Sequence, residues 1–136
     1  EMWAERIDMA RAGNLALMVE TVLGRWFTAD FLETNPDAVE HIRRQYLASS
    51  SEGYAACCEA IRDLDQREMI KTIDRPVLVI GGSEDPATTP AHCRLVADSI
   101  PGAAYVELAG AAHLSNIERA EAFNEALDGF LRSSRR

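Results

Sequence analysis

One stretch of the sequence decides the fold: PVLVIGGSEDP at residues 76–86. Its four consecutive apolar residues, 77–80, are mostly β-branched and precede a Gly-Gly pair. This pattern is typical of a strand buried on both faces of a parallel sheet. Asp85 follows the predicted strand, so it falls in a loop at the strand's carboxyl end, where doubly wound sheets gather their reactive residues.

Strand and helix patterns alternate through the rest of the second half. Thr89 and Pro90 are suited to the N-cap and first turn of a helix that ends at residues 101–102. A second strand is predicted at residues 105–108 and a final amphipathic helix at residues 123–131. This order predicts parallel strands with a right-handed crossover. Two strands are too few to cover each other's edges, so we expect more sheet from outside this sequence.

The first half has the spacing of helices. Apolar side chains recur every three or four positions over residues 3–10 and 15–26, which predicts two helices. Asn35 is a predicted N-cap for a third helix over residues 36–46, which opens on proline. A fourth helix is predicted to follow Gly53.

Composition limits the class of protein. The chain has 136 residues, 47% of them hydrophobic and 26% charged, which is ordinary for a globular domain with a core. A formal net charge of -8 makes nucleic acid a poor partner. No apolar run is long enough to cross a membrane. The Arg-rich tail, residues 132–136, is most simply a solvated end.

The cysteines and the first residues bear on compartment and completeness. Three cysteines, with Cys57 and Cys58 adjacent, form a poor disulfide framework and lack zinc-site spacing, so we expect reduced thiols, no metal and a cytoplasmic location. The charged start lacks the pattern of a signal peptide. A chain that opens on Glu1 without a methionine is expected to be processed or truncated.

Two acid–base residues follow the two predicted strands. Asp85 follows the first, and His113 follows the second in the segment AGAAHL at residues 109–114. A carboxylate that orients an imidazole is part of a Ser-His-Asp triad, and α/β-hydrolases place the acid before the histidine in the chain. Taken singly, an Asp before Pro is often a turn residue and a lone His often has no catalytic role. Glu84 is the rival acid, whereas His41 and His92 are predicted surface residues on helices.

The nucleophile is missing from this pattern. A nucleophile elbow needs Gly-x-Ser-x-Gly between a strand and a helix, and the nearest match, GGSED at residues 81–85, ends on Asp. The serines at 49–51 are predicted to link two helices. Cys57 and Cys58 are predicted to lie mid-helix on an apolar stripe, where burial raises the pKa of a thiol.

Three segments carry a family resemblance: AAHLSNIE at 111–118, PVLVIG at 76–81 and GYAACCEAIRD at 53–63. With them the chain resembles the 3-oxoadipate enol-lactonases, α/β-hydrolases of the β-ketoadipate pathway of aromatic catabolism. The resemblance spans nearly the whole chain. It implies a helical cap over residues 1–65 and, over residues 66–136, the C-terminal part of an α/β-hydrolase core with its last two parallel strands and their helices.

The resemblance also implies a reaction. A small carboxylated enol-lactone would be hydrolysed to 3-oxoadipate without cofactor or metal, with His113 as general base and Asp85 orienting it. The serine would come from an N-terminal hydrolase half acting as a partner. Arg25 and Trp26 could offer a carboxylate partner and an aromatic wall, with Leu114 packing under the site. The alternative is that Trp26 is core and Arg25 is solvated.

Two rival functions stay open. The chain could belong to another α/β-hydrolase, such as an esterase or a perhydrolase. It could also be an inactive fragment whose unpaired sheet edge serves self-association into a homo-oligomer or the binding of a partner. A binding module does not need Asp85 beside His113, so contact between these two residues favours the hydrolase hypotheses.

Overall fold

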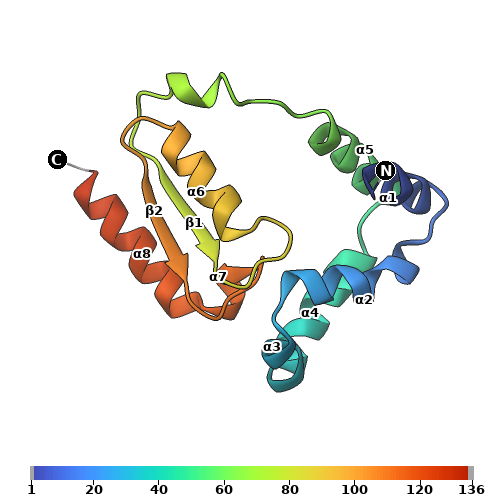
Figure 1. The fold of residues 1–136 in the computed structure, drawn as a ribbon. Coiled ribbons are helices and arrows are strands. Elements are labelled where there is room, and N and C mark those ends of the chain that lie inside the picture. The colour runs from blue at the N-terminus through green and yellow to red at the C-terminus, as the bar shows by residue number, and fades with distance from the viewer. Residues whose placement is uncertain (1, 135–136) are drawn as a thin grey trace. The chain divides into compact units, whose positions relative to one another are not determined.

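The computed structural model describes residues 2–134 and divides the chain into two compact units (Figure 1). The first unit comprises Glu1–Gly24 and Leu32–Asp65, and the second comprises Arg25–Phe31 and Gln66–Arg136. The short segment Arg25–Phe31 therefore belongs with the second half of the chain, although it lies among the first helices in sequence.

Helices make up the first half of the chain. They are α1 (Met2–Arg11), α2 (Leu15–Trp26), α3 (Ala29–Thr34), α4 (Pro36–Leu47) and α5 (Ser51–Arg62). The predicted apolar stripes supply the buried side chains of the first unit, among them Ile7, Val19, Leu23, Val39 and Tyr46. The helical prediction for this half is confirmed.

Three details of the helices differ from prediction. Helix α5 begins at Ser51 and so contains Gly53, because the Ser50 hydroxyl caps it by accepting the Gly53 N–H at 3.2 Å. Asn35 occupies the N-cap of α4 but its side chain makes no capping bond; it donates to Thr34 Oγ1 at 2.9 Å instead. The six-residue helix α3 was not predicted, because it is too short for a periodic pattern.

The second unit contains a two-stranded parallel sheet. Strand β1 (Leu78–Gly82) pairs with β2 (Ala104–Leu108) in a register that runs from Leu78 opposite Ala104 to Gly82 opposite Leu108. Helix α6 (Pro90–Ser99) connects the strands, and helix α8 (Ala120–Ser133) follows them, one on each face of the sheet (Figure 1). The short helices are η1 (Ile70–Thr72) and α7 (Ser115–Glu118). This strand, helix, strand, helix order is the predicted one.

The two strands are less buried than their apolar sequence predicts. In β1 the apolar residues at 78–80 are only half-buried, and no residue of α8 is buried. Leu127 and Leu131 of α8 are exposed. The two strands and their helices therefore leave apolar surface uncovered in the described part of the chain.

Two further observations concern surface and ends. Among residues 2–134, no helix combines the length and apolar character that crossing a membrane requires. At the C-terminal tail Arg132 is exposed and pairs with Asp128 at 2.7 Å, whereas residues 135–136 lie outside the described part.

Candidate active site

The loops after β1 and β2 are joined by backbone hydrogen bonds. The N–H of Ser83 donates to Leu108 O at 3.0 Å, and the N–H of Glu84 donates to Ala111 O at 2.9 Å. In the other direction, the Gly110 N–H donates to Ser83 Oγ at 2.9 Å. These bonds continue the strand pairing beyond the sheet and bring the two loops into one fixed arrangement.

Gly82 is required by the closeness of these loops. A Cβ atom at this position would lie 2.3 Å from Ala111 O and 2.4 Å from Ala112 O, distances that real Cβ atoms do not reach. The obstacle is backbone, which cannot swing aside as a side chain does. The second glycine of the Gly-Gly pair thus admits the loop that carries His113.

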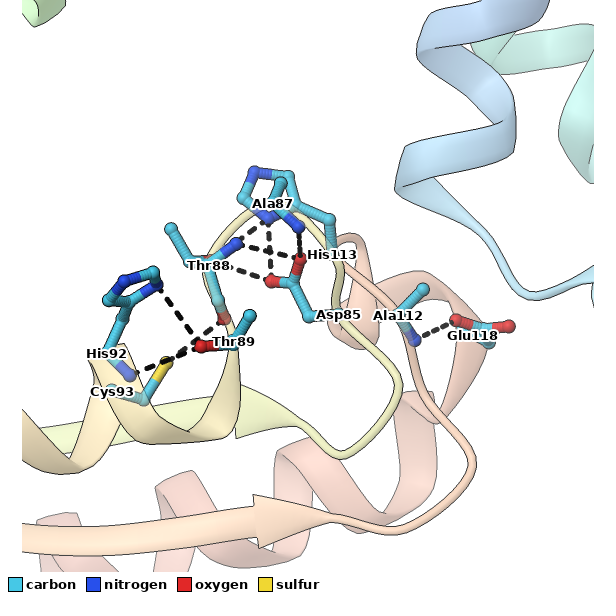
Figure 2. Close-up of polar contacts among 9 residues, drawn as sticks. All are labelled: Asp85, Ala87, Thr88, Thr89, His92, Cys93, Ala112, His113 and Glu118. Atoms are coloured by element: carbon cyan, nitrogen blue, oxygen red, sulfur yellow. Dashed lines mark hydrogen bonds and ion pairs between the residues drawn. The ribbon is translucent and has the colours of Figure 1, made fainter.

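Asp85 and His113 meet at the carboxyl end of the sheet, as Figure 2 shows. Asp85 Oδ2 lies 2.8 Å from His113 Nδ1. Asp85 is buried, with 5% of its surface exposed, whereas the His113 side chain is 35% exposed. The acid is thus held inside while the imidazole reaches the surface, as an orienting acid and a working base require.

Asp85 is held by more than the histidine. Its Oδ1 accepts the Ala87 N–H at 2.7 Å and the Thr88 N–H at 3.0 Å (Figure 2). The Thr88 hydroxyl donates to Oδ2 at 2.6 Å and lies 3.2 Å from His113 Nδ1. Both carboxylate oxygens are therefore fixed, and Thr88 contacts both members of the acid–histidine pair.

These bonds determine the charge of Asp85. Burial by itself raises the pKa of the carboxyl group, because it disfavours the charged form. Hydrogen bonds from the Thr88 and His113 side chains, and from two backbone N–H groups, outweigh burial and bring the pKa below its usual value. Asp85 is accordingly an anion at neutral pH.

An ionised Asp85 defines which nitrogen of His113 carries the proton. A carboxylate can only accept, so Nδ1 is the donor in the bond to Asp85. In the neutral ring Nε2 then carries a lone pair, and it makes no hydrogen bond within residues 2–134. The arrangement can accept a proton at Nε2 and stabilise the resulting imidazolium through Asp85.

The rival residues lie apart from this pair. Glu84 is exposed, and its backbone rather than its carboxylate takes part in the loop pairing. His41 and His92 are exposed on helices α4 and α6, as predicted. Among the two acids that follow β1, only Asp85 contacts the histidine.

One backbone hydrogen bond joins two of the predicted substrate residues. The N–H of Leu114 donates to the carbonyl oxygen of Trp26 at 2.9 Å, so the end of α2 lies against the residue that follows the histidine. Arg25, Trp26 and Leu114 are all half-buried. Trp26 is thus neither core nor fully exposed.

No nucleophile joins the pair within residues 2–134. The Ser83 hydroxyl accepts the Gly110 N–H and holds the loops together. Cys58 is buried, and burial raises the pKa of its thiol. Cys57 is exposed, so its predicted place on the apolar stripe is wrong, because adjacent helix positions point in different directions. All three cysteines are unpaired thiols, and no three His, Cys, Asp or Glu side chains in the described chain cluster to hold a metal ion.

Sequence reasoning missed three residues that build the site: Gly82, Thr88 and Glu118. Gly82 could have been found from the Gly-Gly pair, whereas Glu118, whose Oε2 accepts the Ala112 N–H at 2.6 Å, has no local signal in the sequence. Thr88 follows Asp85 by three positions, a spacing at which a hydroxyl can reach back to a carboxylate.

Comparisons with known proteins identify the family of the chain. A family model described as TAP-like protein matches residues 37–136. 3-Oxoadipate enol-lactonase 2 of Acinetobacter baylyi is 36% identical over 132 residues, which are 97% of this chain and 49% of that protein. Pyrrolizixenacetamide deacetylase of Xenorhabdus hominickii is 33% identical over 135 residues, 98% of this chain and 49% of that protein.

A solved structure extends the likeness to three dimensions. The enol-lactonase from Burkholderia xenovorans matches with a TM-score of 0.92 at 45% identity, over 96% of this chain and 50% of that one. The chain thus spans about half the length of the relatives it matches. It belongs to the TAP-like protein family and has the fold of the C-terminal half of an α/β-hydrolase.

Proposed function

We propose that this chain supplies the acid and the base of a serine hydrolase whose nucleophile lies on an N-terminal half outside these 136 residues. The main support is the bond between Asp85 Oδ2 and His113 Nδ1 at 2.8 Å, at the carboxyl ends of adjacent parallel strands. The relatives' double length fits a second half that carries the serine and covers the half-buried strands.

The proposed reaction has two steps. His113 Nε2 takes the serine proton as the serine oxygen attacks the ester or lactone carbonyl, and Asp85 stabilises the imidazolium. The tetrahedral intermediate collapses, its carbon–oxygen bond to the leaving group breaks, and the imidazolium protonates the leaving oxygen. His113 then takes a proton from water as the water oxygen attacks the carbonyl of the acyl-enzyme. The bond from this carbon to the serine oxygen breaks, the imidazolium returns the proton to that oxygen, and a carboxylic acid and the free serine are released.

For the substrate, we favour a small carboxylated lactone, the enol-lactone that one water molecule opens to 3-oxoadipate. The Acinetobacter relative is named a 3-oxoadipate enol-lactonase, and the Burkholderia structure is named an enol-lactonase. Arg25 is our candidate partner for the substrate carboxylate and Trp26 for an aromatic wall, since the bond from Leu114 N–H to Trp26 O ties their segment to the histidine loop. Residues 1–65 would act as the cap.

A second candidate is removal of an acyl group from an amide or ester. The Xenorhabdus relative is named a deacetylase, and it matches this chain over almost the same length as the enol-lactonase. The same acid–base pair would serve, because acyl transfer to serine needs a base at the hydroxyl and an acid at the leaving atom whatever that atom is.

The first experiment identifies the chains present and their activity. Denaturing mass spectrometry of the purified sample distinguishes a single species of about 15.0 kDa from a sample with a second chain. The 136-residue chain is then assayed alone and with the N-terminal half of the Burkholderia enol-lactonase, on the enol-lactone, an aryl acetate and an N-acetyl amide. We expect activity only in the combined sample, with the enol-lactone preferred.

The outcomes separate the candidates. Preference for the amide would move the chain to the deacylase function, and activity on every ester would indicate a general esterase. A combined sample that forms the complex but hydrolyses none of the three contradicts the hydrolase proposal. Self-association of the chain, measured by light scattering, would then favour an interaction module.

A further inference from the structure

The carboxyl group of Glu118 is buried beside the histidine loop and has no place in the proposed reaction. Only 6% of the residue is exposed. Its Oε2 accepts the N–H of Ala112 at 2.6 Å, as Figure 2 shows. Its Oε1 accepts the N–H of Thr28 at 3.0 Å and the Thr28 hydroxyl. All three residues belong to the second unit.

This carboxylate has donors but no cation. No Lys, Arg or His within residues 2–134 forms an ion pair with Glu118. Removing a carboxylate from water is costly unless hydrogen bonds replace its hydration, and here two N–H groups and one hydroxyl do so. Because its donors lie on the histidine loop and on Thr28, this carboxyl group fixes the geometry between the two.

That geometry surrounds His113. The residue before it, Ala112, is bound by Glu118, and the residue after it, Leu114, donates to Trp26 O at 2.9 Å. The bond at Leu114 therefore leads directly to the segment Arg25–Phe31, and the bond at Ala112 leads to the same segment through Glu118.

The segment itself is firmly held. The Thr28 hydroxyl oxygen accepts the Phe31 N–H at 3.2 Å and so caps helix α3. Phe27 and Phe31 are buried and their rings stack with centroids 5.1 Å apart. Glu118 thus ties the histidine loop to a rigid point.

We propose that Glu118 is a positioning residue that holds the backbone of His113 where its Nδ1 meets Asp85, by joining Ala112 to Thr28. The inference rests on the proposed function, because the position of His113 affects a rate only if His113 is the base. The geometric part can be measured without any substrate.

The principal variant is Glu118→Gln, which keeps the size and one acceptor oxygen. Its amide NH2 must face a donor, either Ala112 N–H or the Thr28 groups, so one of the two attachments breaks. We expect kcat of the combined hydrolase to fall by up to about 100-fold with little change in KM, because a small misplacement of a catalytic group has this scale of effect. In the 136-residue chain, we expect the nitrogen NMR signals of wild-type His113 to show a single tautomer, with the proton on Nδ1. In Glu118→Gln we expect this single tautomer to be lost.

A second pair of variants acts from the other end of the link. Thr28→Val removes the hydroxyl that donates to Glu118, and Thr28→Ser restores it, so the first should reduce kcat and the second should not. In the Glu118→Gln background, Thr28→Val should reduce kcat by less than it does alone, because both changes break the same link. This pair tests the proposal even if Glu118→Gln folds poorly.

Two controls separate positioning from general stability. Glu121→Gln removes an exposed charge from the start of α8, and Val39→Ala weakens the core of the first unit. We expect Glu121→Gln to leave kcat and the His113 signals unchanged. Val39→Ala should lower the melting temperature and leave the His113 signals unchanged.

The outcomes are distinct for the two proposals. Wild-type kcat and unchanged His113 signals in Glu118→Gln would overturn the positioning role, even with a lowered melting temperature. A wild-type sample that hydrolyses none of the substrates, with His113 signals that still change in Glu118→Gln, would overturn the hydrolase function and keep the geometric link.

Discussion

The loop end of the small sheet and the bodies of its strands are built in different ways. At the loop end, the polar groups of residues 83–88 and 110–114 are joined by short hydrogen bonds, and Asp85 is buried. Along the strands, the apolar residues at 78–80 are only half-buried, and α8 leaves Leu127 and Leu131 exposed.

This difference separates what the chain can form by itself from what needs a second half. The acid–histidine pair depends on contacts within one unit, so it can be preformed in the 136-residue chain. The strand bodies depend on apolar cover, which the proposed N-terminal half would provide. Substitutions at the loop end should therefore lower kcat. Substitutions on helices away from this end should change stability alone.

The largest effect is expected at the pair itself. Asp85→Asn replaces the acceptor of the Nδ1 bond and favours the wrong tautomer of His113, and kcat of the combined hydrolase should fall by about 10⁴-fold. His113→Ala removes the base and should cost at least as much. Initial rates on the enol-lactone measure both.

Glu84→Gln is the matched control for this prediction. It neutralises the neighbouring exposed acid, whose backbone N–H still donates to Ala111 O. Its kcat should stay within about twofold of wild type, since water and salt screen the charge of an exposed carboxylate. A large loss in Glu84→Gln with a mild one in Asp85→Asn would exchange the roles of the two acids.

The next effect is expected where the two loops touch. Gly82→Ala brings a methyl group against Ala111 O and Ala112 O, so the histidine loop must move away from β1. We expect kcat/KM to fall by about 100-fold and stability to fall by about 1–3 kcal/mol. Kinetics and urea unfolding test the two losses; a fully active, equally stable variant would mean that the loops tolerate separation.

A smaller effect is expected on the free energy of unfolding at low pH. Burial alone would raise the pKa of Asp85, but the bonds from Thr88 and His113 hold it below its usual value of about 3.9. A carboxyl group with a lowered folded-state pKa stabilises the fold above its unfolded-state pKa, and this stabilisation is lost as pH falls through the folded-state pKa. The free energy of unfolding should therefore decrease from about pH 4 downward, and less steeply in Asp85→Asn.

Asp63→Asn is the comparison for the acid effect. The pKa of Asp63 is also lowered, by its bond to Arg62, but both side chains are exposed and water screens their interaction. Urea unfolding between pH 2 and pH 6 should show a smaller change for Asp63→Asn than for Asp85→Asn. Equal changes would mean that burial and loop contacts do not increase the contribution of Asp85 ionisation to the free energy of unfolding.

The same contrast explains what the sequence could and could not predict. Strand β1, the crossover and the meeting of Asp85 with His113 were predictable, because they depend on hydrophobic pattern and on the common edge where parallel strands end. The role of Glu118 was not, because its partners are Ala112 and Thr28, and a partner 90 positions away leaves no periodic trace. Local sequence pattern predicts the helices and strands, whereas the buried polar contacts between loops are identified only from the three-dimensional structure.

The smallest effect is expected on the outer face of α8. A Cβ atom at Gly129 would meet nothing within 4 Å, and the same holds for Gly24 of α2. Alanine restricts the unfolded chain and favours helix, so Gly129→Ala and its matched variant Gly24→Ala should each stabilise the 136-residue chain by about 0.4–1 kcal/mol. Thermal unfolding measures both, and neither should change the His113 NMR signals. If the combined hydrolase loses the gain from Gly129→Ala but keeps that from Gly24→Ala, then the second half packs against α8, and the uncovered surface of this unit is where it binds.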